Sequence, residues 1–326
     1  MGEVLPFSSF RLSRAEFLRS LGAAAVMAAW PGTGYAAAPS SAPSDAMSPS
    51  AMIARPIPKS GELMPVIGLG TWQTFDVGSD AKARQPLRQV VQLLVDAGGR
   101  MIDSSPMYGR AEGVTGDVVA EMGVRAKVFL ATKVWTSGKE RGIEQMKRSA
   151  TLFRSDVVDL MQIHNLVDWR TQLQTMRQMK SQGRIRYLGI THYTASALPE
   201  LARIIESERD IDFVQLPYSI ESREAETKLL PVAASRGVAV IVNRPFEEGG
   251  LFRRSKGRAL PEWSAEIGCK TWAQFFLKYL IAHPAVTCVI PATSDPRHME
   301  DDLGAGLAPL PDERQRRRMR EAWDAA

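Results

Sequence analysis

The chain alternates between short apolar runs and longer amphipathic stretches, and this alternation constrains its fold more than any other feature. Most of the apolar runs are hydrophobic almost throughout and then meet a polar residue at their C-terminal end. Strands that are buried on both faces of a parallel sheet have this pattern. We therefore expect eight strands, at residues 66–71, 100–105, 128–134, 157–165, 185–193, 213–219, 238–245 and 287–293.

The stretches between these runs have the spacing of amphipathic helices, for example at residues 85–98, 169–184, 195–208, 225–237 and 271–284. Eight strands with helices in nearly every gap predict an α/β fold of the closed (β/α)8, or TIM, barrel type. A doubly wound sheet is the competing prediction. It is disfavoured because the first strand-to-helix turn, GLGTWQTFDVG, lacks a G-x-G-x-x-G phosphate cradle.

Three further segments flank or interrupt the predicted barrel. Ser60-Gly61 favours the turn of a β-hairpin that closes the bottom of the barrel. Residues 246–263 are expected to be the longest irregular loop, placed at the top face where it can cover a ligand. The basic tail ERQRRRMREAW is expected to be a solvated terminal helix.

The N-terminus has the composition of a targeting segment. Arg11, Arg14 and Arg19 precede a short uncharged run that ends in alanines, which is typical of a signal peptide. The heptapeptide SRAEFLR resembles the twin-arginine (Tat) motif, with Ala15 in place of the second arginine. We expect a degenerate Tat-like signal at 1–38, a linker at 39–52, the barrel at 53–326 and a periplasmic or exported protein. The alternative is a disordered leader on a cytoplasmic protein.

Composition excludes several classes of function. The net charge of +5 is too small for a nucleic-acid-binding protein, and the basic residues do not form one stripe. The uncharged run near the N-terminus is too short for a comfortable membrane span, so no stable span is expected in the mature chain. Cys269 and Cys288 suit small core residues, and no metal site is expected because neither the cysteines nor the histidines have ligand spacing. A monomer or weak oligomer is expected.

Four polar residues follow three successive predicted strands. Asp103 ends the second strand and Tyr108 lies in the next loop, Lys133 ends the third strand, and His164 ends the fourth. We expect them to meet at one rim, because active sites of barrels lie at the C-terminal ends of the strands. Lys133 is expected to lower the pKa of Tyr108, and Asp103 to keep Lys133 charged. Tyr108 and His164 then suit proton donation to an oxygen that gains charge, as in carbonyl reduction.

The sequence resembles the aldo-keto reductase family from about residue 53 to about residue 310. Four stretches match successive family motifs in order, namely GLGTW (68–72), the segment from Asp103 to Gly109, ATK (131–133) and QIHN (162–165). The resemblance implies a catalytic tetrad of Asp103, Tyr108, Lys133 and His164, with Tyr108 as the proton donor. It also implies that Trp72 and Trp135 line the substrate pocket, although a core role for each is nearly as well supported.

The resemblance further implies a nicotinamide cofactor, with Gln215 at the nicotinamide carboxamide. The residues implied in binding this cofactor are Thr71, Trp72, Thr191, His192, Gln215, Asn243, Arg244, Thr293, Ser294, Arg297, His298, Asp301 and Asp302. Pro296 suits the first position of a helix whose N-terminus faces an anion.

This chain departs from the family pattern at the cofactor. Thr191-His192 replaces the usual Ser-Asn, Asn243 replaces an aromatic residue, and Ala292 replaces a lysine. NADP(H) is the expected cofactor, with NAD(H) or dual use as the alternative. The expected activity is reduction of an aldehyde or ketone by hydride transfer from NAD(P)H. The competing functions are a cofactor-binding regulatory or redox-sensing subunit and, more remotely, a barrel hydrolase.

Overall fold

The computed structural model describes residues 51–325. The predicted signal at 1–38 and the predicted linker up to residue 50 lie outside the described residues. Within the described part, no helix is long and apolar enough to cross a membrane.

Eight parallel strands follow one another around a single sheet in chain order, as the alternating pattern predicts. They are β3 (Leu69–Gly70), β4 (Met101–Asp103), β5 (Phe129–Val134), β6 (Val158–His164), β7 (Ile185–Thr191), β8 (Phe213–Pro217), β9 (Ala239–Asn243) and β10 (Val286–Val289). Parallel bridges join the first and last strands at Ile67–Val289 and Gly70–Ala292. The prediction of a (β/α)8 barrel is confirmed.

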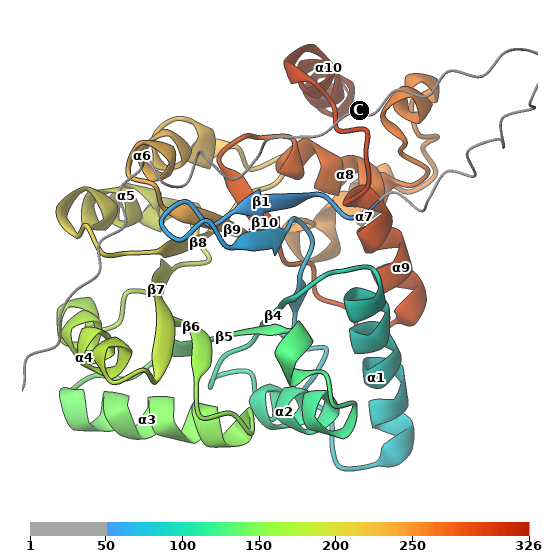
Figure 1. The fold of residues 1–326 in the computed structure, drawn as a ribbon. Helices are drawn as coiled ribbons and strands as arrows, with labels where there is room; N and C mark the ends of the chain where they lie inside the picture. Colours follow the sequence, from blue (N-terminus) through green and yellow to red (C-terminus); the bar gives the residue numbers. More distant parts are fainter. Residues whose placement is uncertain (1–50, 326) are drawn as a thin grey trace, which may run out of the picture. The chain divides into compact units, whose positions relative to one another are not determined.

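The helices lie around the outside of the strands (Figure 1). The helices of the described residues are α1 (Ala81–Asp96), α2 (Ala111–Glu121), α3 (Lys139–Leu152), α4 (Trp169–Ser181), α5 (Leu198–Ser207), α6 (Leu229–Ser235), α7 (Gly250–Ser255), α8 (Trp272–Ile281), α9 (Pro296–Ala305) and α10 (Glu313–Asp324). Their buried faces and the outward-facing residues of the strands form one core.

The inside of the barrel is a second core that changes character along the strands. Inward-facing residues alternate along each strand, and those near the bottom are apolar. Towards the C-terminal ends the inward-facing residues become polar. On β6, for example, the apolar Leu160 is followed by Gln162 and then by His164. The apolar layers fix the strands, and the polar top is where side chains are free for chemistry.

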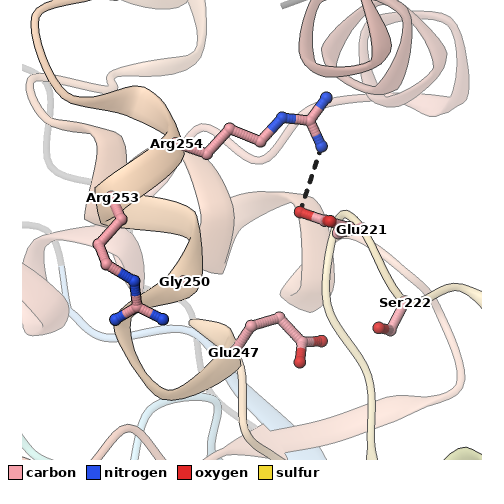
Figure 2. Close-up of a pocket in the computed structure, with 6 residues that line it drawn as sticks. All are labelled: Glu221, Ser222, Glu247, Gly250, Arg253 and Arg254. Carbon is pink, nitrogen blue, oxygen red and sulfur yellow. Dashed lines mark ion pairs between the residues drawn. The ribbon is translucent and has the colours of Figure 1, made fainter.

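Residues 246–263 are more ordered than the sequence predicts. They contain the 3-10 turn Glu247–Gly249 and the helix α7, so much of the expected loop is helical. Figure 2 shows Arg254 of α7 reaching toward Glu221, which lies in the segment after β8, with their charged atoms 3.3 Å apart. A cavity of about 510 Å³ lies between these two segments.

The terminal helix α10 is helical as predicted, but one of its faces is buried and the helix is not simply solvated. Asp312 and Gln315 form a reciprocal capping box at its start. Met319 and Trp323 are fully buried, and Trp323 packs edge-to-face against Phe276 of α8. The tail is therefore part of the barrel's outer layer.

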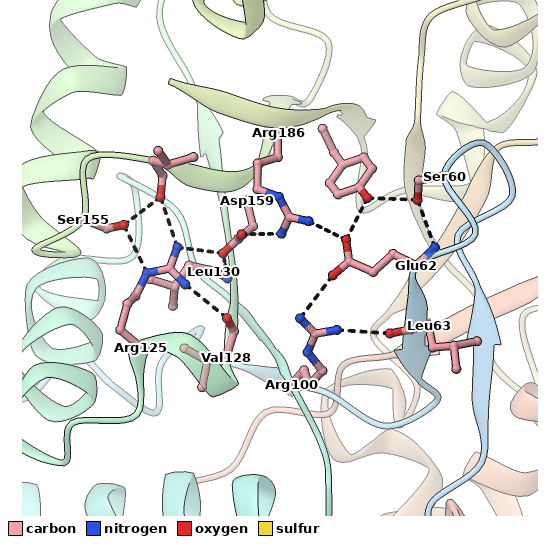
Figure 3. A network of polar contacts seen from close by, with 12 residues as sticks. Ser60, Glu62, Leu63, Arg100, Arg125, Val128, Leu130, Ser155, Asp159 and Arg186 are labelled. Carbon is pink, nitrogen blue, oxygen red and sulfur yellow. Dashed lines mark hydrogen bonds and ion pairs between the residues drawn. The ribbon is translucent and has the colours of Figure 1, made fainter. Parts of the chain in front are cut away.

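The predicted hairpin closes the bottom of the barrel. It consists of β1 (Ala54–Pro56) and β2 (Leu63–Pro65), and Gly61 adopts the positive φ of +75° that its turn requires. Figure 3 shows Glu62 of the hairpin between Arg100 and Arg186, and Arg186 continues to Asp159 on β6 at 2.7 Å. This network ties the hairpin to the strands at the end opposite the predicted site.

Candidate active site

The structure brings the four predicted catalytic side chains together at the C-terminal mouth of the barrel. Asp103, Lys133 and His164 are the inward-facing residues at or near the ends of β4, β5 and β6, three neighbouring strands. Tyr108 reaches the same place from the loop after β4, and its ring lies edge-on to His164 with centroids 6.1 Å apart.

The loop that carries Tyr108 is held by its own backbone and by Asp76. The Tyr108 amide donates to the Ser105 carbonyl at 3.0 Å, and the Arg110 amide donates to Asp76 Oδ1 at 3.1 Å. Gly109 has a φ of +62°, and a Cβ there would overlap the Asp76 carboxylate. Glycine is therefore required directly after the tyrosine, and α2 begins two residues later.

Lys133 and Asp103 form a buried ion pair. Lys133 Nζ lies 2.5 Å from Asp103 Oδ2, donates to the Ser104 carbonyl at 2.7 Å, and lies 5.1 Å from the centre of the Tyr108 ring. Burial acts against the ammonium, but Asp103 and Tyr108 outweigh it and raise the pKa of Lys133. Lys133 thus carries its charge at neutral pH.

The pKa of Tyr108 moves in the opposite direction from the one expected. Burial raises it, Lys133 lowers it and Asp103 raises it, and the net shift is upward. The expectation took account of the ammonium but not of the burial of the phenol, nor of Asp103 neutralising much of the ammonium's field. The phenol is therefore protonated at neutral pH and holds a proton that it can donate.

His164 is neutral. Burial is the main cause that lowers its pKa to about 3, and the charge of Lys133 and the nearby His192 add to the shift. Its Nδ1 lies 3.0 Å from Ser105 Oγ, which fixes the orientation of the ring. A neutral imidazole beside the phenol can hydrogen-bond a carbonyl oxygen without adding a charge.

Gln162 is a residue of this centre that the sequence reasoning missed. Its Nε2 donates to Asp103 Oδ1 at 2.9 Å, and Gln215 Nε2 donates to the same oxygen at 3.0 Å. A signal was present, because Gln162 is polar within an apolar run and lies two residues before His164, on the same face of the strand.

Five of the predicted cofactor residues lie beside this centre. Gln215 Oε1 accepts from Thr191 Oγ1 at 3.1 Å and from Asn243 Nδ2 at 3.3 Å, and Asn243 also donates to the His192 carbonyl. The buried Asn243 Oδ1 has no hydrogen-bond partner among the described residues. Thr71, directly after β3, is buried and donates to the Asp103 carbonyl at 3.0 Å.

Most of the other predicted cofactor residues are already engaged with neighbouring groups. Arg244 pairs with Glu248 at 3.1 Å. Near the start of α9, Arg297 pairs with Asp295 at 2.7 Å, and Thr293 Oγ1 accepts from the Asp295 amide, while Ser294 and His298 are exposed.

Asp301 and Asp302, predicted cofactor residues further along α9, have different surroundings. Asp301 accepts hydrogen bonds from Thr271 and Gln274 at the start of α8. Asp302 is buried, which raises its pKa well above the ordinary value. The Asp301 carboxylate therefore links α9 to the start of α8.

Trp72 and Trp135 lie near the surface and not in the core. They are 39% and 43% exposed, and the Trp135 ring lies 6.3 Å from that of His164. Met107, in the Tyr108 loop, is similarly exposed at 41%. These side chains suit an apolar rim for a substrate. The cavity beside α7 contains none of the predicted catalytic residues and is a separate feature.

A protonated tyrosine, a neutral histidine and a buried Lys–Asp pair at the mouth of a (β/α)8 barrel define the class of this protein. It is an oxidoreductase that reduces carbonyl groups. A family model described as the Aldo/keto reductase family matches residues 66–323, so the chain belongs to that family.

Individual relatives agree with this assignment. The chain is 27% identical over 251 residues to methylglyoxal reductase YeaE of Escherichia coli (strain K12), covering 74% of this chain and 86% of that protein. It is 27% identical over 265 residues to the 9,11-endoperoxide prostaglandin H2 reductase of Trypanosoma cruzi (strain CL Brener), covering 78% and 86%. The fold is similar to that of an aldo-keto reductase from Klebsiella pneumoniae in complex with NADPH, with a TM-score of 0.71, 22% identity, and coverage of 85% and 96%.

Proposed function

We propose that this protein reduces an aldehyde or ketone to the alcohol, with NADP(H) as the hydride donor and Tyr108 as the proton donor. The observation that carries the proposal is the contact between a protonated Tyr108 and a neutral His164, beside a charged Lys133. The similar fold that binds NADPH supports the choice of cofactor.

The chain's own residues account for the movement of the proton. The carbonyl oxygen of the substrate lies between Tyr108 and His164, and both donate hydrogen bonds to it. When bound, the cofactor supplies a hydride to the carbonyl carbon. As charge develops on the oxygen, Tyr108 transfers its phenolic proton to it, and Lys133 stabilises the phenolate that remains. Asp103 keeps the ammonium of Lys133 charged and in place throughout.

The residues present fit a nicotinamide cofactor. Thr191, Gln215 and Asn243 place amide and hydroxyl groups beside the tetrad, and Asn243 Oδ1 is an acceptor that lacks a partner among the described residues. Arg297 and His298 are the cationic or titratable groups available at α9 for the 2′-phosphate. Arg297 must first leave Asp295, so NAD(H) is the cofactor to compare.

A direct assay tests this function. We would follow the oxidation of NADPH and NADH against a panel of aldehydes and ketones, with the purified protein and with Tyr108→Phe. The Phe variant should lose about 10²–10⁴-fold in rate, as is typical when a general acid is removed. Equal rates for the two proteins would contradict the role of Tyr108. Tight nucleotide binding without turnover would favour a regulatory subunit.

We also propose that residues 1–38 direct export, for example to the periplasm, that 39–52 form a linker, and that the barrel of 53–326 acts as a monomer or weak oligomer. The arginines and the uncharged run of the leader support this proposal. Because a compartment outside the cytoplasm offers no pool of free NADPH, we expect the nucleotide to travel with the folded protein. Cell fractionation, the intact mass of the mature chain and light scattering test the three parts. A full-length chain that stays in the cytoplasm would overturn the first.

A further inference from the structure

The Asp103 carboxylate is held from two sides. Oδ2 accepts from Lys133 Nζ at 2.5 Å, and Oδ1 accepts from the amides of Gln162 and Gln215 at 2.9 and 3.0 Å. These four residues are each at most 2% exposed, so no solvent replaces a lost donor easily. Hydrogen bonds to a buried charge are stronger than those between neutral groups.

The orientation of the Gln162 amide is set by its neighbours. Gln215 Nε2 donates to Gln162 Oε1 at 3.3 Å, while Gln215 Oε1 accepts from Thr191 and Asn243. With its oxygen facing Gln215, Gln162 must present its NH2 group to Asp103. The three side chains of Asp103, Gln162 and Gln215 come from β4, β6 and β8, so they form one layer across the barrel interior.

Gly189 on β7 makes room for the Gln162 side chain. The two residues are partners in the β6–β7 register, and a Cβ on Gly189 would lie 2.9 Å from Gln162 Cγ and 3.3 Å from the Phe213 carbonyl oxygen. Real Cβ atoms do not approach a neighbour that closely without movement. The barrel is thus built so that Gln162 can extend across its interior to Asp103.

We propose that Gln162 is a positioning residue of the reaction centre. It holds the Asp103 carboxylate with one oxygen toward Lys133, and its hydrogen bond weakens the effect of the negative charge of Asp103 on Tyr108. The inference rests on the proposed function of Tyr108 as proton donor. Gln162 itself is expected to contact neither substrate nor nucleotide.

The charged and titratable groups around Tyr108 come from three further strands. They are Lys133 on β5 and His164 on β6, which face its ring, and Cys288 on β10, whose thiol feels the charge of Asp103. His164 is neutral above the acid range, and burial raises the pKa of the Cys288 thiol. A change in the alkaline titration therefore reports on Tyr108 and its pairing with Lys133.

The test compares Gln162→Met, which removes the donor and keeps the length, with Met161→Leu, a buried control on the same strand that faces the outer core. Tyrosinate absorbance is titrated for each protein against the same protein carrying Tyr108→Phe, without nucleotide or substrate. Loss of the donor should move the Tyr108 midpoint upward by about one pH unit, which is the size of one charged hydrogen bond. The kcat at neutral pH should fall about 3- to 10-fold, with KM and nucleotide Kd within about twofold.

Gln162→Glu provides the conservative variant. Its carboxyl can donate to Asp103 only while protonated, so kcat should match wild type in the acid range and fall to the level of Gln162→Met as the new group ionises. A Gln162→Met titration that superimposes on that of Met161→Leu overturns the proposal. If Gln162→Met does not fold, a Gln162→Glu protein with an unchanged pH dependence overturns it. Absence of turnover in wild type would contradict the proposed function, but the titration would still be readable.

Discussion

Lys133 lies between a carboxylate and a phenol, with its ammonium 2.5 Å from Asp103 Oδ2 and 5.1 Å from the centre of the Tyr108 ring. The ion pair is fully enclosed by the barrel, whereas Tyr108 keeps one part toward the mouth. This arrangement makes the charge state of the centre depend on the side chains that the strands carry and not on solvent.

Removing one partner of the ion pair should be worse than removing both. Lys133→Met leaves Asp103 charged and unpaired in the interior, and the free energy of unfolding should fall by about 3–5 kcal/mol. Adding Asp103→Asn removes the orphaned charge, so the double variant should recover part of that stability while remaining inactive. Denaturant unfolding and the reductase assay measure the two effects. A double variant less stable than Lys133→Met would contradict the account.

The rate of carbonyl reduction should be flat through neutral pH. Tyr108 must be protonated to act, and its pKa is raised, mainly by burial. The rate should therefore fall only above the ordinary tyrosine value of about 10, whereas alcohol oxidation, which needs the phenolate, should rise over the same range. A kcat profile of both directions checks this. A reduction rate that already halves between pH 7 and 8 would be inconsistent with it.

Acid should destabilise the protein through His164. The pKa of His164 is about 3 in the folded state, below its value in the unfolded state. The contribution of the neutral imidazole to the free energy of unfolding is therefore complete above about pH 6.5. It is lost progressively as the pH falls towards 3, because only the unfolded state takes up the proton over this range. Between pH 6.5 and 5, wild type should lose about 2 kcal/mol more than His164→Gln, since each pH unit corresponds to 1.36 kcal/mol. Urea unfolding at the two pH values tests this. Parallel losses in both proteins would show that His164 is not the cause.

The bottom of the barrel should affect stability without affecting chemistry. Glu62→Gln weakens the links from the hairpin to Arg100 and Arg186, and we expect a loss of about 1 kcal/mol because the pairs are partly exposed. The kcat should be unchanged, since Glu62 lies at the end of the barrel opposite Tyr108. Thermal unfolding and the reductase assay separate the two, and a several-fold loss of kcat would refute this division.

The fold was predictable because strand burial leaves a strong local signal. All eight predicted strands overlap those observed, and the hairpin turn at Gly61 is in place. The buried face of α10 and the helix α7 were not predicted. Their stability comes from tertiary contacts, such as Trp323 against Phe276, which no local pattern records.

The candidate site was predictable in its members but not in its electrostatics. Motif positions give Asp103, Tyr108, Lys133 and His164, and their chemical roles stay a prediction until tested. The direction of the Tyr108 pKa depends on how deeply the phenol is buried, which is a property of the assembled barrel. The same holds for Gln162, whose partner lies 59 residues away in the chain.

The enclosed Lys133–Asp103 pair has a consequence for the end of each turnover. Because the two charges cancel, the side chains of the centre carry no net charge before reaction and one negative charge, beside the Lys133 ammonium, once Tyr108 has given up its proton. The resulting phenolate is a strong base at a half-open mouth, so water can return the proton to it without any relay through the interior. Reprotonation of Tyr108 then needs only access of solvent, which is restored when the product leaves.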